Sequence, residues 1–391
     1  MRMADVKMRY GDRILAFQAA AHRCPELGGQ ETETTALIRA HMAPLALEEL
    51  PLGLPTGCAF RLRGGRPGSA VVLRADIDAL AVEEPEGRAV RSERPGRMHA
   101  CGHDVHMAAL YGAALALAGR RAEVAGDVVF LFQPAEETTD GAAAVVRSGL
   151  LPRVSAQAVF GLHNMPSLPV GTIGVREGPL MAAKDSFQIA VCGRGGHGAE
   201  PERCADPVVA AAAIVGALQT IVSRNVAPRD TAVVSVCSIH GGSSDNRIAD
   251  TVELAGSART FSEQTGALVR QRIGQVAAAC AAAYGCTARV AFPDLTPPVV
   301  NAPALLPVAE AAAAQAGRVV RPEPVMISED FSFYCQQLPA FFLFLGSGRA
   351  KEGGPADAPL HSAGFCAHPD TALYGAALLA GLVEEMGRRG A

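Results

Sequence analysis

Cys101 and His103 stand two residues apart in the segment HACGHDVHM, and their side chains are of types that bind transition metals. A bent loop can turn both toward one point, as a shared metal ion requires. The simpler interpretation is a buried cysteine beside a surface histidine, which is the usual case for an isolated pair of this kind. The neighbouring Asp104, together with His99 and His106, favours a metal site, because carboxylates commonly orient metal-binding histidines.

Two adjacent carboxylates, Glu136 and Glu137, close the segment FQPAEE directly after the apolar run VVFLF. Like charges this close repel unless a positive group compensates them. One of the two can bind a metal while its neighbour acts as a general base. The alternative is a pair of solvated glutamates at the positively charged beginning of a helix.

Two further histidines come at places where a metal ligand would fit. His163 follows the apolar run AVFGL, and His361 lies in LHSAGF after the strand-like segment FFLFLGS. Either residue alone is more often a structural histidine than a ligand. Only convergence with the residues above would place them in a metal site.

Short β-branched strands must position these residues, and they alternate with Ala-rich helices in the pattern of an α/β fold. We expect strands at Ala70–Leu73, Asp127–Phe132, Ala158–Gly161, Ser186–Val191, Thr231–Ile239, Val252–Ala258 and Phe341–Leu345. The motifs RADIDAL, HACGHDVHM, FQPAEE and FGLHNMP fall at strand ends or beside glycine turns. Open α/β sheets bind their ligands at the carboxyl ends of the strands.

The chemically suggestive residues fall in two blocks, 76–163 and 329–361. The chain between them, 184–296, has the pattern strand, helix, strand, strand, helix, strand. We therefore predict one domain inserted into another, with 1–183 and 297–391 forming the metal-binding catalytic domain and 184–296 the inserted one. The segments MAAKDSF and FPDLTPPVVN are the expected crossing points.

Composition and charge favour a globular protein that acts on a small molecule. The chain has 391 residues, of which 49% are hydrophobic, and a formal net charge of -4, which argues against a nucleic-acid or anionic-membrane partner. The N-terminal segment lacks the apolar core of a signal peptide, and no apolar run approaches the roughly 18 residues of a membrane span. The ten cysteines include no CxxC pair. We expect a cytoplasmic protein in which nine of the ten cysteines are packing residues.

Seven motifs occur in one order: ADIDAL, HACGHDVHMA, QPAEE, GLHNMP, GRGGHGAEP, SEDFSFY and HSAGF. Together they resemble the metallopeptidase family that includes aminoacylase and the carboxypeptidase G enzymes. The similarity is to its amidohydrolase branch, which contains hippurate hydrolases, indole-acetyl-amino-acid hydrolases and N-acyl-amino-acid deacylases. The resemblance implies a mixed-sheet, zinc-peptidase-like catalytic domain, interrupted by a smaller α+β domain that acts as a lid and forms a homodimer.

The resemblance also implies two divalent metal ions per subunit. Zn, Mn, Ni and Co all suit a shell of thiolate, imidazole and carboxylate groups. Carried over to this sequence, Cys101 would bridge the ions, Glu137 and His361 would complete one site, and His103 and His163 the other. Which histidine serves which ion is left open.

Several residues lie beside these ligands or depart from the family's pattern. Asp76 stands where carboxypeptidase-type members have a metal-binding histidine, so we expect Asp76 and Asp78, like Asp104, to orient the ligands instead of binding metal. Glu329 in SEDFSFY is expected near the site. Glu202 occupies the last position of the GGHGAxPH motif of this branch, so a polar contact in that loop should differ.

The function implied is metal-dependent hydrolysis of the amide bond of an N-acyl or N-aroyl amino acid, as in hippurate hydrolases. Glu136 would be the general base that takes a proton from the attacking water and later protonates the leaving amine. His197, among four glycines in GRGGHGAEP, would stabilise the oxyanion in the site of the partner subunit. The thirteen-residue separation of Asn246 and Arg259 matches the spacing of the carboxylate-binding pair in the carboxypeptidase members, so the resemblance implies that both bind the substrate carboxylate. The strand between them is expected to bring both to one edge.

Three other functions stay open at this point. Within the same chemistry, the substrate could be N-acetyl-diaminopimelate or a dipeptide. As a protein of a different class, the chain could be a ligand-binding or structural relative that kept the fold but lost catalysis. An intact Glu136 and five intact ligand positions speak against this alternative.

Overall fold

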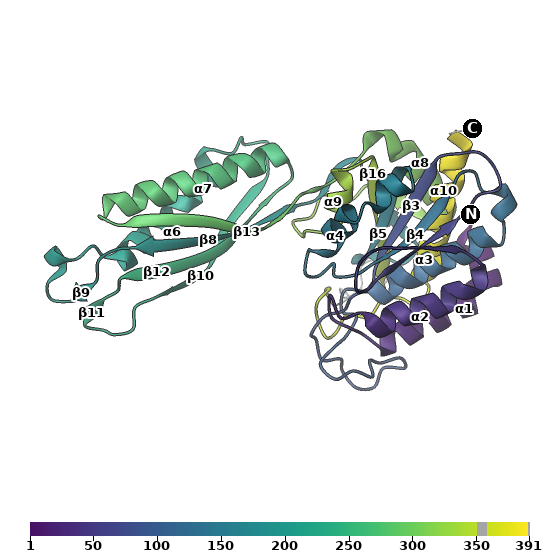
Figure 1. Cartoon of the computed structure of the whole chain (residues 1–391), viewed down its shortest axis with the longest axis horizontal. Coiled ribbons are helices and arrows are strands. Elements are labelled where there is room, and N and C mark those ends of the chain that lie inside the picture. Colours follow the sequence, from purple (N-terminus) through teal and green to yellow (C-terminus); the bar gives the residue numbers. More distant parts are fainter. Residues whose placement is uncertain (350–357, 390–391) are drawn as a thin grey trace. The chain divides into compact units, whose positions relative to one another are not determined.

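The computed structural model describes residues 1–349 and 358–389, and the chain divides into two compact units (Figure 1). The first consists of Met1–Gly178, Val300–Glu323 and Asp330–Ala391, and the second of Pro179–Val299 and Pro324–Glu329. The first unit is therefore assembled from three separate segments. The chain passes from one unit to the other four times.

An eight-stranded mixed sheet forms the centre of the first unit, in the order β1-β2-β4-β3-β5-β16-β6-β15. Its strands are β1 (Glu48–Leu50), β2 (Cys58–Leu62), β3 (Ala70–Asp76), β4 (Val128–Gln133), β5 (Ala156–Pro169), β6 (Thr172–Gly174), β15 (Arg318–Val320) and β16 (Ala340–Gly348). The central strands β4, β3, β5 and β16 are parallel. Each of the seven strands expected from the sequence overlaps an observed strand, but most ends differ by up to three residues, and β5 extends to Pro169, well beyond the expected Gly161.

The direction of the crossovers decides where a ligand can bind. β3 leads through α3 (His103–Ala118) to β4, and β4 leads through α4 (Gly141–Arg147) and α5 (Leu150–Arg153) to β5 on the other side of β3. Because parallel crossovers are right-handed, the two directions place α3 and the α4–α5 pair on opposite faces of the sheet. The loops after β3 and β4 therefore diverge at a switch point, where open α/β sheets bind their ligands.

Helix α3 is buried along its length against α1 (Met3–Arg23) and α10 (Thr371–Arg389). A Cβ atom at Gly112 would lie 2.6 Å from the Cβ of Ala376 in α10 and 2.7 Å from Cδ1 of Ile14 in α1. The three helices approach this closely only because position 112 has no side chain. The remaining helices of the unit are α2 (Thr32–Met42), α8 (Leu306–Ala316) and α9 (Ser332–Cys335).

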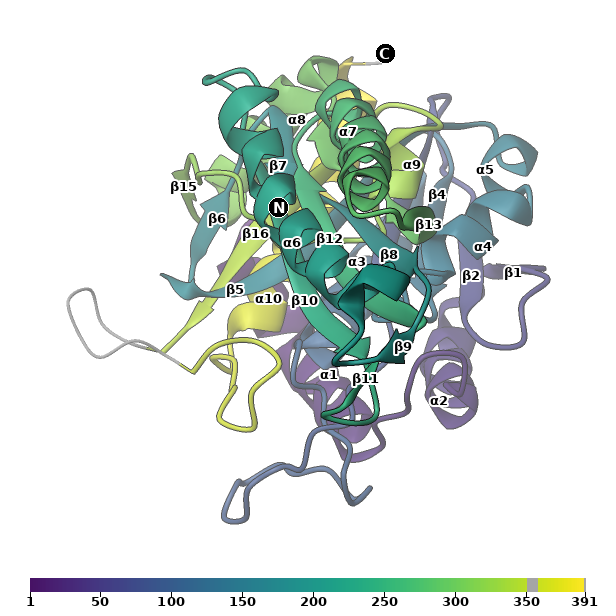
Figure 2. The ribbon, with the colours of Figure 1, turned by 90° about the vertical axis from the view of Figure 1, so that its left-hand side faces the viewer.

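The second unit is an antiparallel sheet in the order β10-β12-β8-β13, against which α6 (Pro207–Arg224) and α7 (Glu263–Ala283) lie next to each other (Figure 2). Its strands are β8 (Ala183–Cys192), β10 (Ala232–Gly241), β12 (Thr251–Thr260) and β13 (Thr287–Thr296), and β9 (Gly196–His197) pairs with β11 (Arg247–Ile248) in a small ribbon. β7 (Gly178–Met181) and β14 (Val299–Asn301) form a separate two-stranded ribbon. Side chains of Asp206 and Ser262 accept main-chain N–H bonds and so cap the beginnings of α6 and α7.

Helix α6 is long and apolar enough to cross a membrane, by length and composition only, whereas we expected no apolar run of that length. A single such helix is weak evidence for a membrane span. Its side chains Ala210, Ile214, Leu218 and Ile221 are buried in the hydrophobic core of the second unit, as in a core helix of a globular domain.

Candidate metal centre

The first unit brings together six residues that were expected at the site: Cys101, His103, Glu136, Glu137, His163 and His361. The register of the sheet explains part of this arrangement. Asp76 at the end of β3 lies level with Gln133 at the end of β4, and Arg74 lies level with Gly161 of β5. Two residues further along each strand, His163 lies level with Asp76 at the end of β3, next to the loops that follow β3 and β4.

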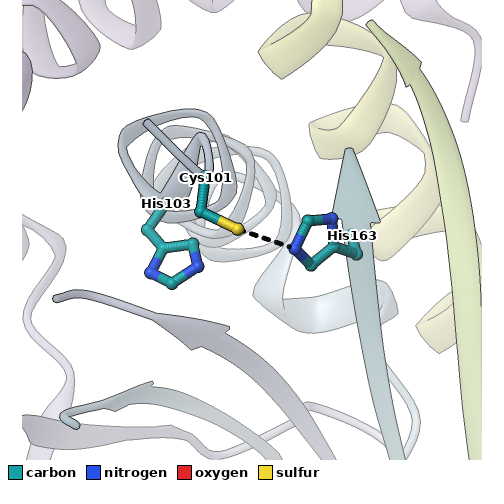
Figure 3. A group of neighbouring side chains, drawn as sticks. All are labelled: Cys101, His103 and His163. Carbon is teal, nitrogen blue, oxygen red and sulfur yellow. Dashed lines mark hydrogen bonds between the residues drawn. The ribbon is translucent and has the colours of Figure 1, made fainter. Parts of the chain in front are cut away.

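Cys101, His103 and His163 form one buried group, whose donor atoms all lie within 4.8 Å of one another (Figure 3). Sγ of Cys101 is 3.3 Å from Nε2 of His163. Gly102 separates the cysteine from His103 and has a φ of +84°, and a Cβ atom there would lie 2.3 Å from Nδ2 of Asn164. Glycine thus allows the sharp bend that turns both side chains toward one point.

Cys101 also belongs to a second group, with Glu137 and His361. Nε2 of His361 lies 3.3 Å from Oε1 of Glu137. The main-chain N–H of His361 donates to the carbonyl of Ala100 at 2.9 Å, which ties this distant segment to the loop of Cys101. One thiol is therefore common to two groups of potential ligands.

Glu136 lies at the edge of the same cluster. Its Oε2 atom is 4.0 Å from Nε2 of His103, and its side chain is largely buried. It is absent from both groups that share Cys101. A carboxylate that is near the donors yet outside these two groups can exchange protons with a reacting molecule.

Main-chain carbonyls orient two of the histidines. Nδ1 of His103 is 2.9 Å from the carbonyl oxygen of Asp78, and Nδ1 of His163 is 2.7 Å from that of Asn164. A carbonyl only accepts, so Nδ1 carries the proton in each ring, and Nε2 of a neutral ring offers a lone pair. Among the described residues, Nε2 of His103 has no hydrogen-bond partner. A buried nitrogen in this condition is suited to a metal ion.

The electrostatics of the cluster also fit a cation. Burial raises the pKa of the Cys101 thiol well above its usual value, so the thiolate that a metal needs is costly here without a neighbouring positive charge. Burial opposes ionisation of Glu137, but His361 and His103 outweigh it and lower the pKa of this carboxyl. Burial lowers the pKa of His163 to about 3, which keeps the ring neutral. The residues present therefore fit divalent metal ions.

A chain of buried hydrogen bonds lies behind the ligands, and the sequence did not reveal most of it. Arg74 is fully buried, and its Nη1 donates to Oδ2 of Asp76 at 2.8 Å. Oδ1 of Asp76 is 2.6 Å from Nδ1 of His106, whose Nε2 accepts the main-chain N–H of Asn164 at 2.9 Å. The side-chain amide of Asn164 donates to the carbonyl of Cys101 at 2.6 Å. Both nitrogens of His106 are engaged, so this histidine orients the site instead of binding metal.

One pattern in the sequence could have predicted part of this network. An arginine in an otherwise apolar strand, two residues before an aspartate, is typical of a buried ion pair. Asp78 also supports the ligands from behind, because its Oδ2 accepts the main-chain N–H of Glu137 at 2.9 Å.

For Asp104 the structure differs from the expectation. Its carboxylate lies 3.1 Å from Nδ1 of His22 and accepts a bond from Gln18 at 3.2 Å, so it faces α1 and not the ligands. The reason is helical geometry, because adjacent residues of α3 point in directions about 100° apart, which turns Asp104 away from His103. Glu329 is buried in the short segment that belongs to the second unit, and its place at the site stays a prediction.

His197 and Asn246 lie at one end of the second unit, and Arg259 lies at the other. The N–H of Gly198, next to His197, donates to the carbonyl of Asn246 at 2.8 Å. Arg259 is eight residues beyond Thr251, where β12 begins, and at about 3.3 Å per residue this amounts to about 26 Å. The expectation that the strand brings Asn246 and Arg259 to one edge is therefore wrong within one subunit, because an extended strand separates its ends.

A mixed sheet that carries thiol, imidazole and carboxylate groups at the carboxyl ends of its strands has the architecture of a metal-dependent hydrolase. Residues 72–385 match peptidase family M20/M25/M40. The chain belongs to this family of hydrolases, which confirms the resemblance, the fold class and the enzymatic nature that the seven motifs implied.

Relatives of known name cover almost the whole chain. N-acetylcysteine deacetylase of Bacillus subtilis (strain 168) is 42% identical over 352 residues, which are 90% of this chain and 92% of the relative. IAA-amino acid hydrolase ILR1-like 4 of Arabidopsis thaliana is 38% identical over 379 residues, covering 95% and 85%. The solved structure of the Bacillus subtilis YXEP protein, a dinuclear metal binding peptidase from the M20 family, has a TM-score of 0.84 at 37% identity, covering 96% and 97%.

Proposed function

We propose that this chain hydrolyses the amide bond of N-acyl amino acids with two divalent metal ions. Cys101, Glu137 and His361 would hold one ion, and Cys101, His103 and His163 the other. The observation that carries the proposal is that both groups of donor atoms share one residue, Cys101. A thiolate can bridge two ions, and the mixed donors are compatible with Zn, Mn, Ni or Co.

Ions bound there would lower the pKa of a water molecule toward neutrality and polarise the amide carbonyl. The remaining chemistry falls to Glu136. An Oε atom of this residue takes a proton from the attacking water as the new C–O bond forms. It delivers that proton to the amide nitrogen as the C–N bond breaks, releasing a carboxylic acid and a free amino acid.

The substrate class is supported by what the named relatives have in common. An N-acyl amino acid is the substrate named for N-acetylcysteine deacetylase and for N-acetyldiaminopimelate deacetylase of Bacillus subtilis (strain 168), the latter 36% identical over 339 residues. We propose that Arg259 binds the free carboxylate. Its Nη1 donates to Oγ of Ser328 at 3.2 Å, which holds the guanidinium in place, and a guanidinium has five N–H donors in all.

A homodimer formed through the second unit is part of the proposal. His197 and Asn246 lie together in exposed segments, so they would act as a pair, and we propose that they complete the site of the partner subunit. β10 is an edge strand with exposed Val233 and Ile239, the kind of surface that pairs with another chain.

The test begins with the purified protein, stripped with a chelator and reloaded with Zn, Mn, Ni or Co. Release of free amine is then measured from N-acetylcysteine, N-acetyl-diaminopimelate, hippurate and a dipeptide. We expect hydrolysis of N-acyl amino acids only after reloading. The substrate ranking separates acetyl from aroyl preference and from dipeptidase activity. A metal-loaded protein that cleaves none of the N-acyl amino acids would overturn the proposal.

A further inference from the structure

The turn that carries Glu136 and Glu137 has an unusual backbone. Ala135, directly before them, has a φ of +58°, in the left-handed region that a residue with a Cβ atom rarely adopts. Such a conformation persists only where its surroundings hold it. Contacts of the surrounding residues must therefore hold Ala135 in place.

Two carboxylates accept hydrogen bonds from the main chain of this turn. Oδ2 of Asp78 accepts the N–H of Glu137 at 2.9 Å, and Oε1 of Glu31 accepts the N–H of Ala135 at 2.7 Å. Asp78 comes from the loop after β3 and was expected near the ligands. Glu31 comes from the beginning of α2 and has no place in the chemistry proposed so far.

Glu31 is itself fixed at both ends and fully buried. Its second carboxylate oxygen, Oε2, accepts the hydroxyl of Thr56 at 2.8 Å. Its main-chain carbonyl accepts the hydroxyl of Thr35 at 2.5 Å and the N–H of the same residue at 3.0 Å. The backbone and the carboxylate of Glu31 are therefore both held in place where the side chain contacts Ala135.

The segment before Glu31 lies close against the same turn. A Cβ atom at Gly28 would lie 3.0 Å from Cγ2 of Thr138 and 3.2 Å from Oδ2 of Asp78. The N–H of Ala79 donates to the carbonyl of Glu26 at 2.8 Å, so this segment also follows the loop after β3. The segment before Glu31 therefore packs against the loops after β3 and β4, which carry the proposed ligands and the general base.

We propose that Glu31 is a positioning residue of the site. By holding the N–H of Ala135 it keeps this residue in the left-handed conformation, and so sets where the carboxylates of Glu136 and Glu137 lie. The inference rests on the proposed function, because it assigns Glu136 to proton transfer and Glu137 to metal binding. Without the hydrogen bond from Ala135 to Glu31, Ala135 relaxes toward an ordinary backbone conformation, and the carboxylates of Glu136 and Glu137 move.

Three variants of Glu31 and one matched control test this. Glu31→Gln keeps an oxygen for Ala135 and an amide for the hydroxyl of Thr56. Glu31→Ala removes the hydrogen bond to Ala135, and Glu31→Asp is too short by one methylene to reach both partners. The control is Glu26→Ala, because the buried Glu26 side chain, in the same segment, bonds within the described residues to Glu33 and Thr34 at the beginning of α2 and not to Ala135.

Binding of Zn²⁺ to the metal-free protein, kcat and KM for an N-acyl amino acid, and thermal unfolding are measured for each variant. Glu31→Ala and Glu31→Asp should lower kcat and weaken Zn²⁺ binding by roughly 10–100-fold, the usual effect of losing a group that orients a metal ligand. KM should change much less, and Glu31→Gln should stay within about threefold of the wild type. Glu26→Ala leaves the main-chain carbonyl that bonds Ala79 in place, so it should lower the unfolding temperature and change kcat and Zn²⁺ affinity far less than Glu31→Ala does.

A double variant makes the mechanism specific. Glycine adopts a positive φ without the clash of a Cβ atom, so Ala135→Gly should recover part of the kcat lost in Glu31→Ala. A folded Glu31→Ala or Glu31→Asp protein with wild-type kcat and Zn²⁺ affinity would overturn the inference. If the wild type binds Zn²⁺ but hydrolyses nothing, the proposed function fails, and the Zn²⁺ measurements still decide the role of Glu31.

Discussion

The two units hold their candidate residues in opposite ways. In the first unit His103 and His163 are buried, and each has a main-chain carbonyl 2.7–2.9 Å from its Nδ1 atom. In the second unit His197 and Asn246 are exposed, and their side chains bond, within the described residues, to neighbours in their own loops. The candidate metal ligands are thus brought together within a single folded chain. The residues of the second unit have no comparable support and need a substrate or a second subunit to fix them.

The largest effect should come from the general base in the first unit. Glu136→Gln keeps the size of the side chain but cannot accept a proton, so kcat should fall by roughly 10²–10⁴-fold with both metals still bound. Steady-state rates and metal analysis of the same sample check this. The matched variant Glu137→Gln should lose metal as well as rate. Retention of a tenth of the wild-type rate in Glu136→Gln would contradict the assignment.

Removal of the shared thiol should act on metal content. In Cys101→Ser a hydroxyl that stays protonated replaces a thiolate, so metal binding should weaken by more than the roughly 10–100-fold that orienting residues cost. Titration of the metal-free protein with Zn²⁺ measures this. Cys24→Ser and Cys366→Ser are controls that should bind metal normally. Full occupancy in Cys101→Ser would reduce Cys101 to a packing residue.

The buried polar groups of the first unit should also give it a pH dependence. Burial lowers the pKa of His22, but Asp104 and Glu84 outweigh it and raise the pKa from 6.5 to about 9. Protonated His22 therefore contributes about 3 kcal/mol below pH 6.5, and this contribution is lost as the pH rises toward 9. Chemical denaturation between pH 6 and 10 should show a flatter profile for His22→Gln. The exposed His240 of the second unit is the control, and His240→Gln should follow the wild type.

Arg259 tests the substrate contact proposed for the second unit. A hydrogen bond between charged groups is worth about 1.5–3 kcal/mol, so Arg259→Ala should lose roughly 10–100-fold in kcat/KM for N-acyl amino acids. Their carboxamides should be poor substrates for the wild type and lose little further. A wild-type enzyme that cleaves acids and carboxamides equally well would exclude a carboxylate-binding role for Arg259.

Mixed dimers give the smallest signal and the sharpest test of the comparison. Random mixing of inactive His197→Ala and Glu136→Gln chains makes half of the dimers mixed, and one of the two sites in each is complete. About a quarter of the wild-type sites should then be active, if His197 serves the partner subunit. If mixed dimers form and remain inactive, His197 acts in the active site of its own subunit or takes no part in the reaction.

Local patterns were enough to predict the strands and the cluster of candidate metal ligands. Strands such as β4 are continuous apolar runs, and polar residues follow directly where they end. Because the carboxyl ends of parallel strands meet at one edge, motifs far apart in the chain could be placed together without knowing the sheet order. The cluster of Cys101 with His103 and His163 agrees with that reasoning, while its occupation by metals stays a prediction.

What the sequence did not predict depends on direction and distance. The spacing of Asn246 and Arg259 along the chain does not give their distance, because Arg259 lies near the far end of the ten-residue strand β12 that begins after Asn246. Asp104 was grouped with its sequence neighbour, although helix geometry turns it away. Glu31 could not be found at all, because its partner Ala135 lies more than a hundred residues further along the chain.

The pairing of β5 with β16 has a consequence for synthesis on the ribosome. Phe344 lies opposite His163, so a central strand of the first sheet arrives only after the whole of 179–299 has been translated. The second unit is nearly continuous in the chain and can fold first, while the first must wait for β16 and α10. A nascent chain that stalls before residue 340 therefore exposes the unpaired edge of β5, an apolar strand open to pairing with other chains.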